Sequence, residues 1–151
     1  MEEITFSLKN RNVFAWLSMI TVLAFHVLDE TLNDFLPWYN QTIMGMRERF
    51  GFFPAPTFSF EVWLGGLIGA IIIAYILTFV VMKGGKIIRI ITTILGILMI
   101  LNALNHIGGS MYTGRMLPGT WSSPFLLITS VFVVFQGIRG NWQSQKKLNF
   151  I

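Results

Sequence analysis

The chain has 151 residues, of which 54% are apolar and only 12% charged, and its net charge is +4. A soluble globular domain carries about 25% charged residues, so this composition, with its long apolar runs, predicts an integral membrane protein. The basic residues are spread over segment ends instead of forming a patch, which argues against nucleic-acid binding, and the absence of Cys excludes disulfides and thiolate metal sites.

The first apolar segment carries polar side chains near its far end. Its purely apolar part, residues 13–25, gives about 20 Å of helix, which is too short for a hydrocarbon core about 30 Å thick. Continuing to Leu36 gives about 36 Å, and we expect Pro37 to end the helix just before the interfacial aromatics Trp38 and Tyr39. No small-residue cleavage site follows, so residues 13–36 are predicted to be a retained span.

Three further apolar segments follow, at residues 60–82, 87–107 and 124–138, with Glu61 at the entry of the first of them. Gly65 and Gly69 give residues 60–82 a small-residue face, which predicts close helix packing and offers a contact for a homo-oligomer. The connection at residues 37–57 is too polar to span and is expected to lie on the membrane surface, either as an interfacial loop or as a lid. The expected fold is all-α, an integral membrane four-helix transmembrane bundle forming one domain over residues 1–151.

The Lys and Arg residues predict the orientation of the bundle. Eight of them lie at segment ends that would share one side of the membrane: Lys9, Arg11, Lys83, Lys86, Arg89, Arg139, Lys146 and Lys147. Three lie on the other side: Arg47, Arg49 and Arg115. Because positive charge is retained inside, we expect a multi-pass protein of the cell membrane with both termini in the cytoplasm.

Two trios of polar residues have the spacing i, i+3, i+4. They are His26, Asp29 and Glu30 in the first span, and Asn102, Asn105 and His106 in the third. This spacing places each trio on one helix face, and a rise of about 1.5 Å per residue brings both trios to the outer half of the membrane. Unpaired polar groups in hydrocarbon cost several kcal/mol, so the stripes are expected to face each other in one buried cluster, with Glu61 at its rim.

Two chemistries fit such a cluster. His26, Glu30 and His106 are the ligand types of Zn²⁺ or another divalent ion. Alternatively, imidazole and carboxyl groups can act without metal as general base and general acid. Asp29 and Asn102 complete the candidate catalytic set, and a purely structural clamp between the helices is the remaining reading. The candidates for substrate contact at the rim are Glu61, Asn105 and Tyr112.

These residues resemble the HXXEE-motif family of small bacterial membrane proteins. The family carries His-x-x-Glu-Glu, then Asn-x-x-x-His, then Tyr-x-Pro-Gly. The chain has HVLDE at 26–30, NALNH at 102–106 and MLPG at 116–119, in the same order. Asp29 replaces the first Glu of the family and Met116 replaces its Tyr, with Tyr112 one turn earlier as the candidate replacement for the phenol. The resemblance implies a membrane protein of unknown function, with the site at these residues.

The sequence favours a membrane-embedded enzyme acting on a lipophilic small molecule that enters from the membrane lipid. The reaction would be an isomerisation, a cyclisation or a hydrolysis, and the cofactor, if there is one, a divalent metal ion. A proton- or cation-coupled transporter or sensor is one alternative, because intramembrane carboxylates and imidazoles also bind ions. A small structural subunit, docking through the Gly65 and Gly69 face, is the other.

Overall fold

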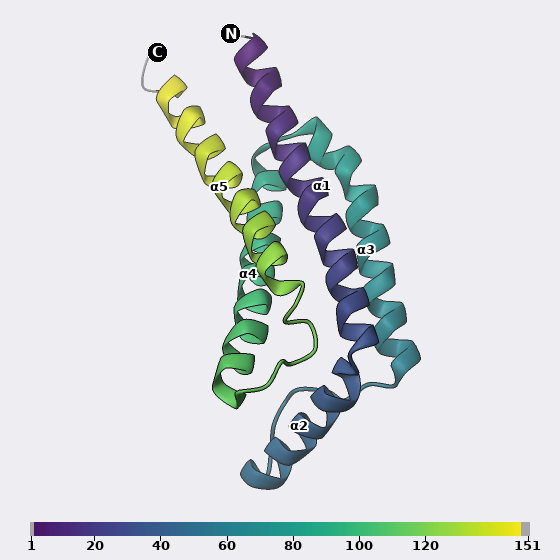
Figure 1. Ribbon diagram of the computed structural model, residues 1–151. Helices are drawn as coiled ribbons and strands as arrows, with labels where there is room; N and C mark the ends of the chain where they lie inside the picture. The colour runs from purple at the N-terminus through teal and green to yellow at the C-terminus, as the bar shows by residue number, and fades with distance from the viewer. Residues whose placement is uncertain (1, 149–151) are drawn as a thin grey trace.

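The chain folds into five helices, as the computed structural model shows for the backbone of residues 2–148 and the side chains of residues 11–139. The helices are α1 (Glu2–Leu32), α2 (Phe35–Phe50), α3 (Phe60–Lys83), α4 (Lys86–Thr113) and α5 (Ser123–Leu148) (Figure 1). Residues 2–148 contain no strand, so the prediction of an all-α protein is confirmed.

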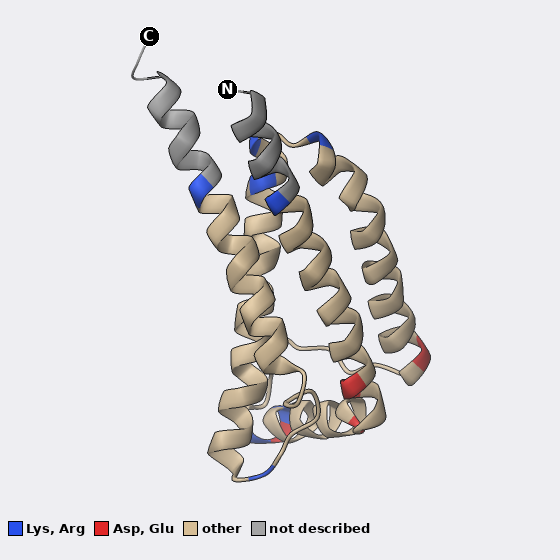
Figure 2. Ribbon diagram, turned by 45° about the horizontal axis from the view of Figure 1, so that its top comes forward, with Lys and Arg blue, Asp and Glu red and all other residues tan. Residues whose placement is uncertain are grey.

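Three helical stretches are long and apolar enough to cross a membrane: Arg11–Leu32, Phe60–Lys83 and Lys86–Thr113. The apolar part of α5, Ser123–Arg139, is shorter. The Lys, Arg, Asp and Glu residues lie toward the two ends of these helices, and their middles carry none (Figure 2). Long uncharged helices of this kind indicate a membrane protein.

α1 ends earlier than the sequence predicted. It stops at Leu32, where Asp34 takes a left-handed conformation with φ 56°, and α2 begins at Phe35. The expectation that Pro37 ends the first helix was wrong. Pro37 lies in the first turn of α2, where its missing N–H costs no helical hydrogen bond.

The connection predicted at residues 37–57 is largely helical, because α2 occupies most of it. The remaining segment folds back along α2. Asn40 bonds both backbone groups of Phe58, at 2.8 and 3.1 Å, and the Tyr39 hydroxyl donates to the carbonyl of Pro56 at 3.0 Å. Figure 1 shows α2 at the end of the molecule opposite the two termini.

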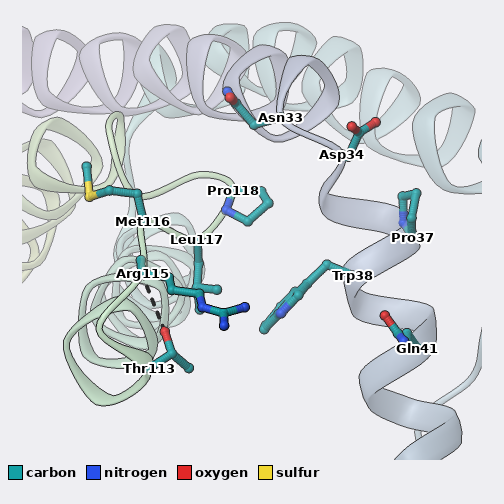
Figure 3. Close-up of a pocket in the computed structure, with 10 residues that line it drawn as sticks. All are labelled: Asn33, Asp34, Pro37, Trp38, Gln41, Thr113, Arg115, Met116, Leu117 and Pro118. Atoms are coloured by element: carbon teal, nitrogen blue, oxygen red, sulfur yellow. Dashed lines mark hydrogen bonds between the residues drawn. The ribbon is translucent and has the colours of Figure 1, made fainter.

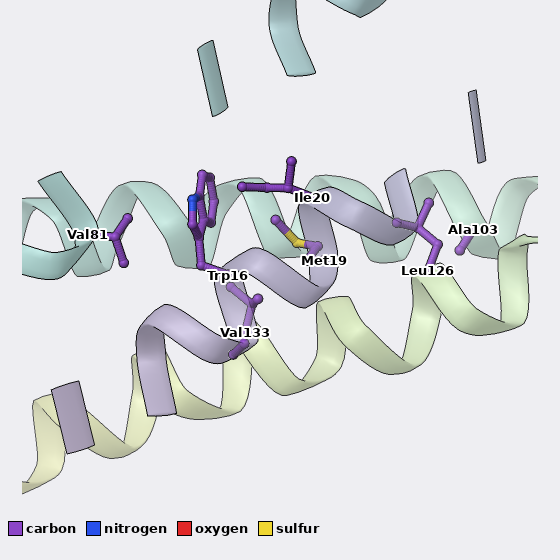
Figure 4. Packing of buried hydrophobic residues seen from close by; sticks show 8 residues of the cluster. Trp16, Met19, Ile20, Val81, Ala103, Leu126 and Val133 are labelled. Carbon is purple, nitrogen blue, oxygen red and sulfur yellow. The ribbon is translucent and has the colours of Figure 1, made fainter. Parts of the chain in front are cut away.

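α1 is the central helix of the packing. It contacts α3 on one side and α5 on another, while α4 packs mainly on α5 and barely touches α3. The buried apolar cluster lies along α1, and its largest side chains are Trp16, Met19, Ile20 and Leu126 (Figure 4). The Trp16 indole also donates a hydrogen bond to the carbonyl of Ala74 in α3, at 3.2 Å.

Close helix approach occurs at glycines other than those predicted. A Cβ at Gly96 would lie 2.9 Å from Val134 and 3.3 Å from the carbonyl oxygen of Ser130, and one at Gly137 would collide with Thr93. These contacts set the tight packing of α4 on α5. Gly65 and Gly69 in α3 have no heavy atom of the described residues within 4 Å of a Cβ position, so neither is a point of close approach to another described helix.

Candidate functional site

Three ionisable side chains converge between α1 and α4. Oε1 of Glu30 lies 3.5 Å from Nε2 of His26 and 3.0 Å from Nε2 of His106. The two imidazole rings stand edge to face, with centroids 4.9 Å apart. His26 is 1% exposed, Glu30 5% and His106 6%, so the cluster is buried inside the protein.

Helix geometry explains why α1 supplies two of these groups. His26 and Glu30 are four residues apart, which places them one above the other on the same face. His106 comes from α4 and completes the cluster across the bundle. The predicted cluster between the first and third apolar helices therefore forms around these three residues.

The carbonyl of Pro118 fixes the tautomer of His106. Nδ1 of His106 lies 2.7 Å from this oxygen, which can only accept a hydrogen bond, so Nδ1 carries the proton. In a neutral ring, Nε2 then presents its lone pair to Glu30. This is the arrangement that holds metal-binding histidines in other proteins, where the second ring nitrogen donates to a backbone carbonyl or a carboxylate.

Ser122 orients His26 in a similar way. Its hydroxyl and its backbone N–H both lie within hydrogen-bond reach of Oδ2 of Asp29, at 2.7 and 3.0 Å. With the hydroxyl proton donated to Asp29, the Ser122 oxygen accepts from Nδ1 of His26, 2.7 Å away. Nε2 of His26 then carries the lone pair, and this buried atom has no hydrogen-bond partner among the described residues.

Gly119 allows the loop between α4 and α5 to lie directly on the cluster. Its φ is +82°, a conformation that favours glycine. A Cβ at this position would lie 2.9 Å from two atoms of the His106 ring and 3.1 Å from Cγ of Glu30. The Ser123 hydroxyl donates to the Gly119 carbonyl at 2.7 Å and anchors the turn to the start of α5.

Aromatic rings cover the cluster on the α2 side. The ring of Phe35 lies 5.4 Å from that of His106 and 5.9 Å from that of Trp63, measured between centroids. The break between α1 and α2 brings Phe35 to this position. An apolar cover lowers the local dielectric, and it therefore strengthens electrostatic interactions within the cluster.

The donor set fits a divalent metal ion. One ligand atom from each of His26, Glu30 and His106 lies within 4.8 Å of the other two. Ligands bound tetrahedrally to zinc at about 2.0–2.1 Å are separated by roughly 3.3 Å, close to the 3.0 and 3.5 Å contacts of Glu30. Two imidazoles and one carboxylate are also a ligand set of catalytic zinc sites.

The other predicted residues lie outside this inner cluster. Asp29 accepts hydrogen bonds from Ser122, and Asn102 is partly buried, with an Oδ1 atom that no side chain or backbone group in the described part of the chain bonds. Asn105 and Glu61 are exposed, and Tyr112 is 93% exposed. Because successive helical residues are about 100° apart, Asn105 points away from the face that carries His106.

The sequence prediction missed three contributors to the site: Ser122, the carbonyl of Pro118 and the ring of Phe35. The Pro-Gly pair at 118–119 was the available signal for the loop, since it belongs to the third motif of the family. No spacing rule connects Ser122 or Phe35 to residues that lie tens of positions away. Their roles follow from the tertiary fold.

The comparisons identify a family and no closer relative. A family described as "Protein of unknown function with HXXEE motif" matches residues 16–134, a stretch that includes the whole cluster and Ser122. No curated protein and no solved structure is similar enough to the chain to count as a match. The match covers most of the chain, and the chain therefore belongs to the family of HXXEE-motif proteins.

Proposed function

We propose that this protein is a membrane-embedded enzyme in which His26, Glu30 and His106 hold a divalent metal ion. One observation carries the proposal: three buried ligand atoms converge, and each imidazole has its Nδ1 engaged by another group. In neutral rings this leaves the lone pair of each imidazole on Nε2, beside Oε1 of Glu30, where a cation would be bound by all three. A helix clamp alone would also bring these groups together, but it would not need the lone pairs of both rings to face the carboxylate of Glu30.

The chemistry we propose is an isomerisation, a cyclisation or a hydrolysis of a lipophilic substrate. A divalent ion held by three protein ligands supplies Lewis-acid chemistry at a remaining coordination position. The protein contributes orientation and exclusion of water. The hydrogen bonds that the two Nδ1 atoms donate to the carbonyl of Pro118 and the hydroxyl of Ser122 fix the imidazoles, and Phe35 covers that of His106.

A second candidate is metal-free acid–base catalysis by the same residues. The 3.0 Å distance between Nε2 of His106 and Oε1 of Glu30 is that of a hydrogen bond, and a proton shared there could be passed to a substrate. Asn102, one turn before His106, has an unpartnered amide oxygen that could orient a substrate hydroxyl or amine.

We also propose that four helices cross the cell membrane, with both termini in the cytoplasm. The excess of Lys and Arg at the segment ends on the side of the termini supports this orientation. The cluster would then lie in the half of the membrane away from the cytoplasm. In the same arrangement, the unpacked face at Gly65 and Gly69 would be available to lipid or to a second copy of the chain.

The test of the metal site is metal content by mass spectrometry on protein purified in dodecyl maltoside. We expect about one zinc, iron or manganese ion per wild-type chain, and its loss in His26→Ala, His106→Ala and Glu30→Gln. Asn105→Ala is the matched control, because Asn105 neighbours His106 in sequence but is exposed. A well-folded wild type without metal after supplementation would exclude this proposal and favour metal-free acid–base chemistry.

The test of catalysis compares lipid extracts incubated with the wild type and with Glu30→Gln. Mass spectrometry of both should show a lipophilic compound that is consumed, and a product that forms, only with the wild type. Identical profiles, with metal bound and across several lipid sources, would argue that the cluster is structural or couples ion movement.

A further inference from the structure

A pocket of about 630 Å³ lies beside the cluster, between the start of α2 and the loop after α4. Figure 3 shows its two walls. Asp34, Trp38 and Gln41 come from the α2 side, and Arg115 and Pro118 from the loop side. None of the three ligand residues lines it, so this pocket is distinct from the candidate metal site.

The pocket lies at the end of the apolar helices. Its lining residues begin just after Leu32, where the apolar stretch of α1 ends, and continue from Thr113, the last residue of α4. In a membrane protein, the ends of the apolar helices lie at the boundary between hydrocarbon and water. A ligand in the pocket therefore lies at the depth of lipid headgroups.

Two opposite charges belong to the lining of this pocket and do not pair with each other. Among the described side chains, Asp34 and Arg115 form no salt bridge together, and no protein hydrogen bond engages the carboxylate of the one or the guanidinium of the other. The guanidinium of Arg115 and the indole of Trp38 point toward each other from opposite walls (Figure 3). In the same view the carboxylate of Asp34 lies at the edge of the pocket, turned away from Arg115. The pocket thus offers a cation to an anionic group within it, and an anion to a cationic group at its rim.

Two residues that line the pocket form hydrogen bonds with the candidate metal site or with the residues that orient it. Asn33, a lining residue, donates from Nδ2 to Oδ1 of Asp29 at 2.8 Å, and Asp29 holds Ser122 beside His26. Pro118, also in the lining, accepts the hydrogen bond of His106. A ligand in the pocket therefore contacts Asn33, which is linked to His26 through Asp29 and Ser122, and Pro118, which is bonded directly to His106.

We propose that this pocket binds the headgroup of an aminophospholipid, with Arg115 on the phosphate and Asp34 on the primary ammonium. A guanidinium matches the geometry of a phosphate, and a carboxylate accepts hydrogen bonds from an ammonium that has N–H groups. The side-chain amide oxygen of Gln41, which is also in the lining, adds a further acceptor for these N–H groups. That the bound lipid is the substrate of the metal site rests on the proposed function.

The experiment measures binding of three short-chain lipids to the full protein in dodecyl maltoside, by isothermal titration calorimetry. The probes are dihexanoyl phosphatidylethanolamine, phosphatidylcholine, whose ammonium has no N–H, and phosphatidylglycerol, which has no amine. We expect the ethanolamine lipid to bind about tenfold tighter than either of the others, the effect of one charge-assisted hydrogen bond. Equal binding of all three, or no binding, would overturn the inference.

Two substitutions separate the two charges. Asp34→Asn should abolish the preference for the ethanolamine lipid over phosphatidylglycerol, and asparagine tolerates the left-handed backbone at this position. Arg115→Gln should weaken the binding of both the ethanolamine lipid and phosphatidylglycerol about tenfold. Glu48→Gln and Arg49→Gln are the matched controls, because both residues are exposed on α2 and outside the pocket. Unchanged selectivity in Asp34→Asn would contradict the assignment of the ammonium site.

A further probe identifies the source of the ligand. O-Phosphoethanolamine carries the same two charges without acyl chains, and it should bind more weakly than the lipid. Equal affinity would place a soluble metabolite in the pocket and contradict the lipid assignment. Because binding is read without turnover, lipid binding by a metal-free protein would overturn only the proposed function, and metal without lipid selectivity would overturn only this inference.

Discussion

The imidazole of His106 lies directly against the α-carbon of Gly119. A Cβ on Gly119 would come within 2.9 Å of both Cε1 and Nδ1 of the ring, closer than side-chain contacts allow. The same glycine has φ +82°, so the backbone conformation and the packing both require the absence of a side chain. This contact gives a physical reason for a glycine in the third motif.

Gly119→Ala is expected to displace His106 and to weaken metal binding, measured by competition with a chelator, at least about tenfold, an effect the size of losing an orienting partner. Gly114→Ala is the matched control, because Gly114 has a positive φ of 65° but no atom within 4 Å of a Cβ. It carries the backbone strain without the contact. Equal metal loss in the two variants would show that strain, and not the contact with His106, is responsible.

Ser122→Ala should weaken metal binding about 10- to 100-fold and leave the fold intact, since the substitution removes the group that orients His26. Competition with a chelator measures the affinity. Thr129→Ala is a suitable control, because its hydroxyl bonds only carbonyls of its own helix. Wild-type affinity in Ser122→Ala would mean that His26 needs no such partner.

The two acids of the first motif should differ in importance. Glu30→Ala removes a ligand and should abolish metal binding, whereas Asp29→Ala removes a group that holds Ser122 and should weaken it about 10- to 100-fold. Chelator competition on both variants checks the order. The reverse order would place Asp29, and not Glu30, on the ion.

The packing of α4 on α5 predicts a contrast between two glycines. Gly137→Ala should destabilise the fold by about 1–3 kcal/mol, the usual cost of overpacking, because Thr93 occupies the space of the new methyl group. Gly65→Ala should have no such effect, because nothing lies within 4 Å. Unfolding by denaturant in mixed micelles measures both, and similar destabilisation would contradict the packing described.

The orientation can be tested with single cysteines, since the chain has none of its own. In intact cells, a membrane-impermeant maleimide should label Thr57→Cys, in the connection between α2 and α3. Lys86→Cys, at the start of α4, should react only after the membrane is permeabilised. The opposite pattern would place the termini outside.

The inner cluster could be predicted from sequence because it depends on helical periodicity. His26 and Glu30 share a helix face because they are four residues apart. His106 lies in an apolar helix, where an ionisable side chain is stable only beside other polar groups. The same reasoning included Asn105, which is exposed. A stripe of i, i+3 and i+4 is wider than the face that a neighbouring helix covers, so its margin can point outward.

The surroundings of the cluster could not be predicted in this way. Ser122 and Pro118 lie in a loop, whose conformation depends on tertiary contacts and not on a repeating pattern. The break before Phe35 was also missed, because Pro37 looked like a helix stop. The same sequence around a proline fits either the first turn of a new helix or the end of the preceding one. The left-handed backbone at Asp34 breaks the helix before Pro37, so Pro37 belongs to the new helix.

The order of the chain has a consequence for biosynthesis. His26 and Glu30 emerge early, in α1, yet Pro118 and Ser122, which orient the imidazoles, are made only after α4. A nascent chain that stops before Pro118 holds every ligand residue of the cluster and neither of its orienting partners. The unfinished protein must therefore hold its imidazoles in or near the bilayer without these two hydrogen bonds until the loop before α5 is made.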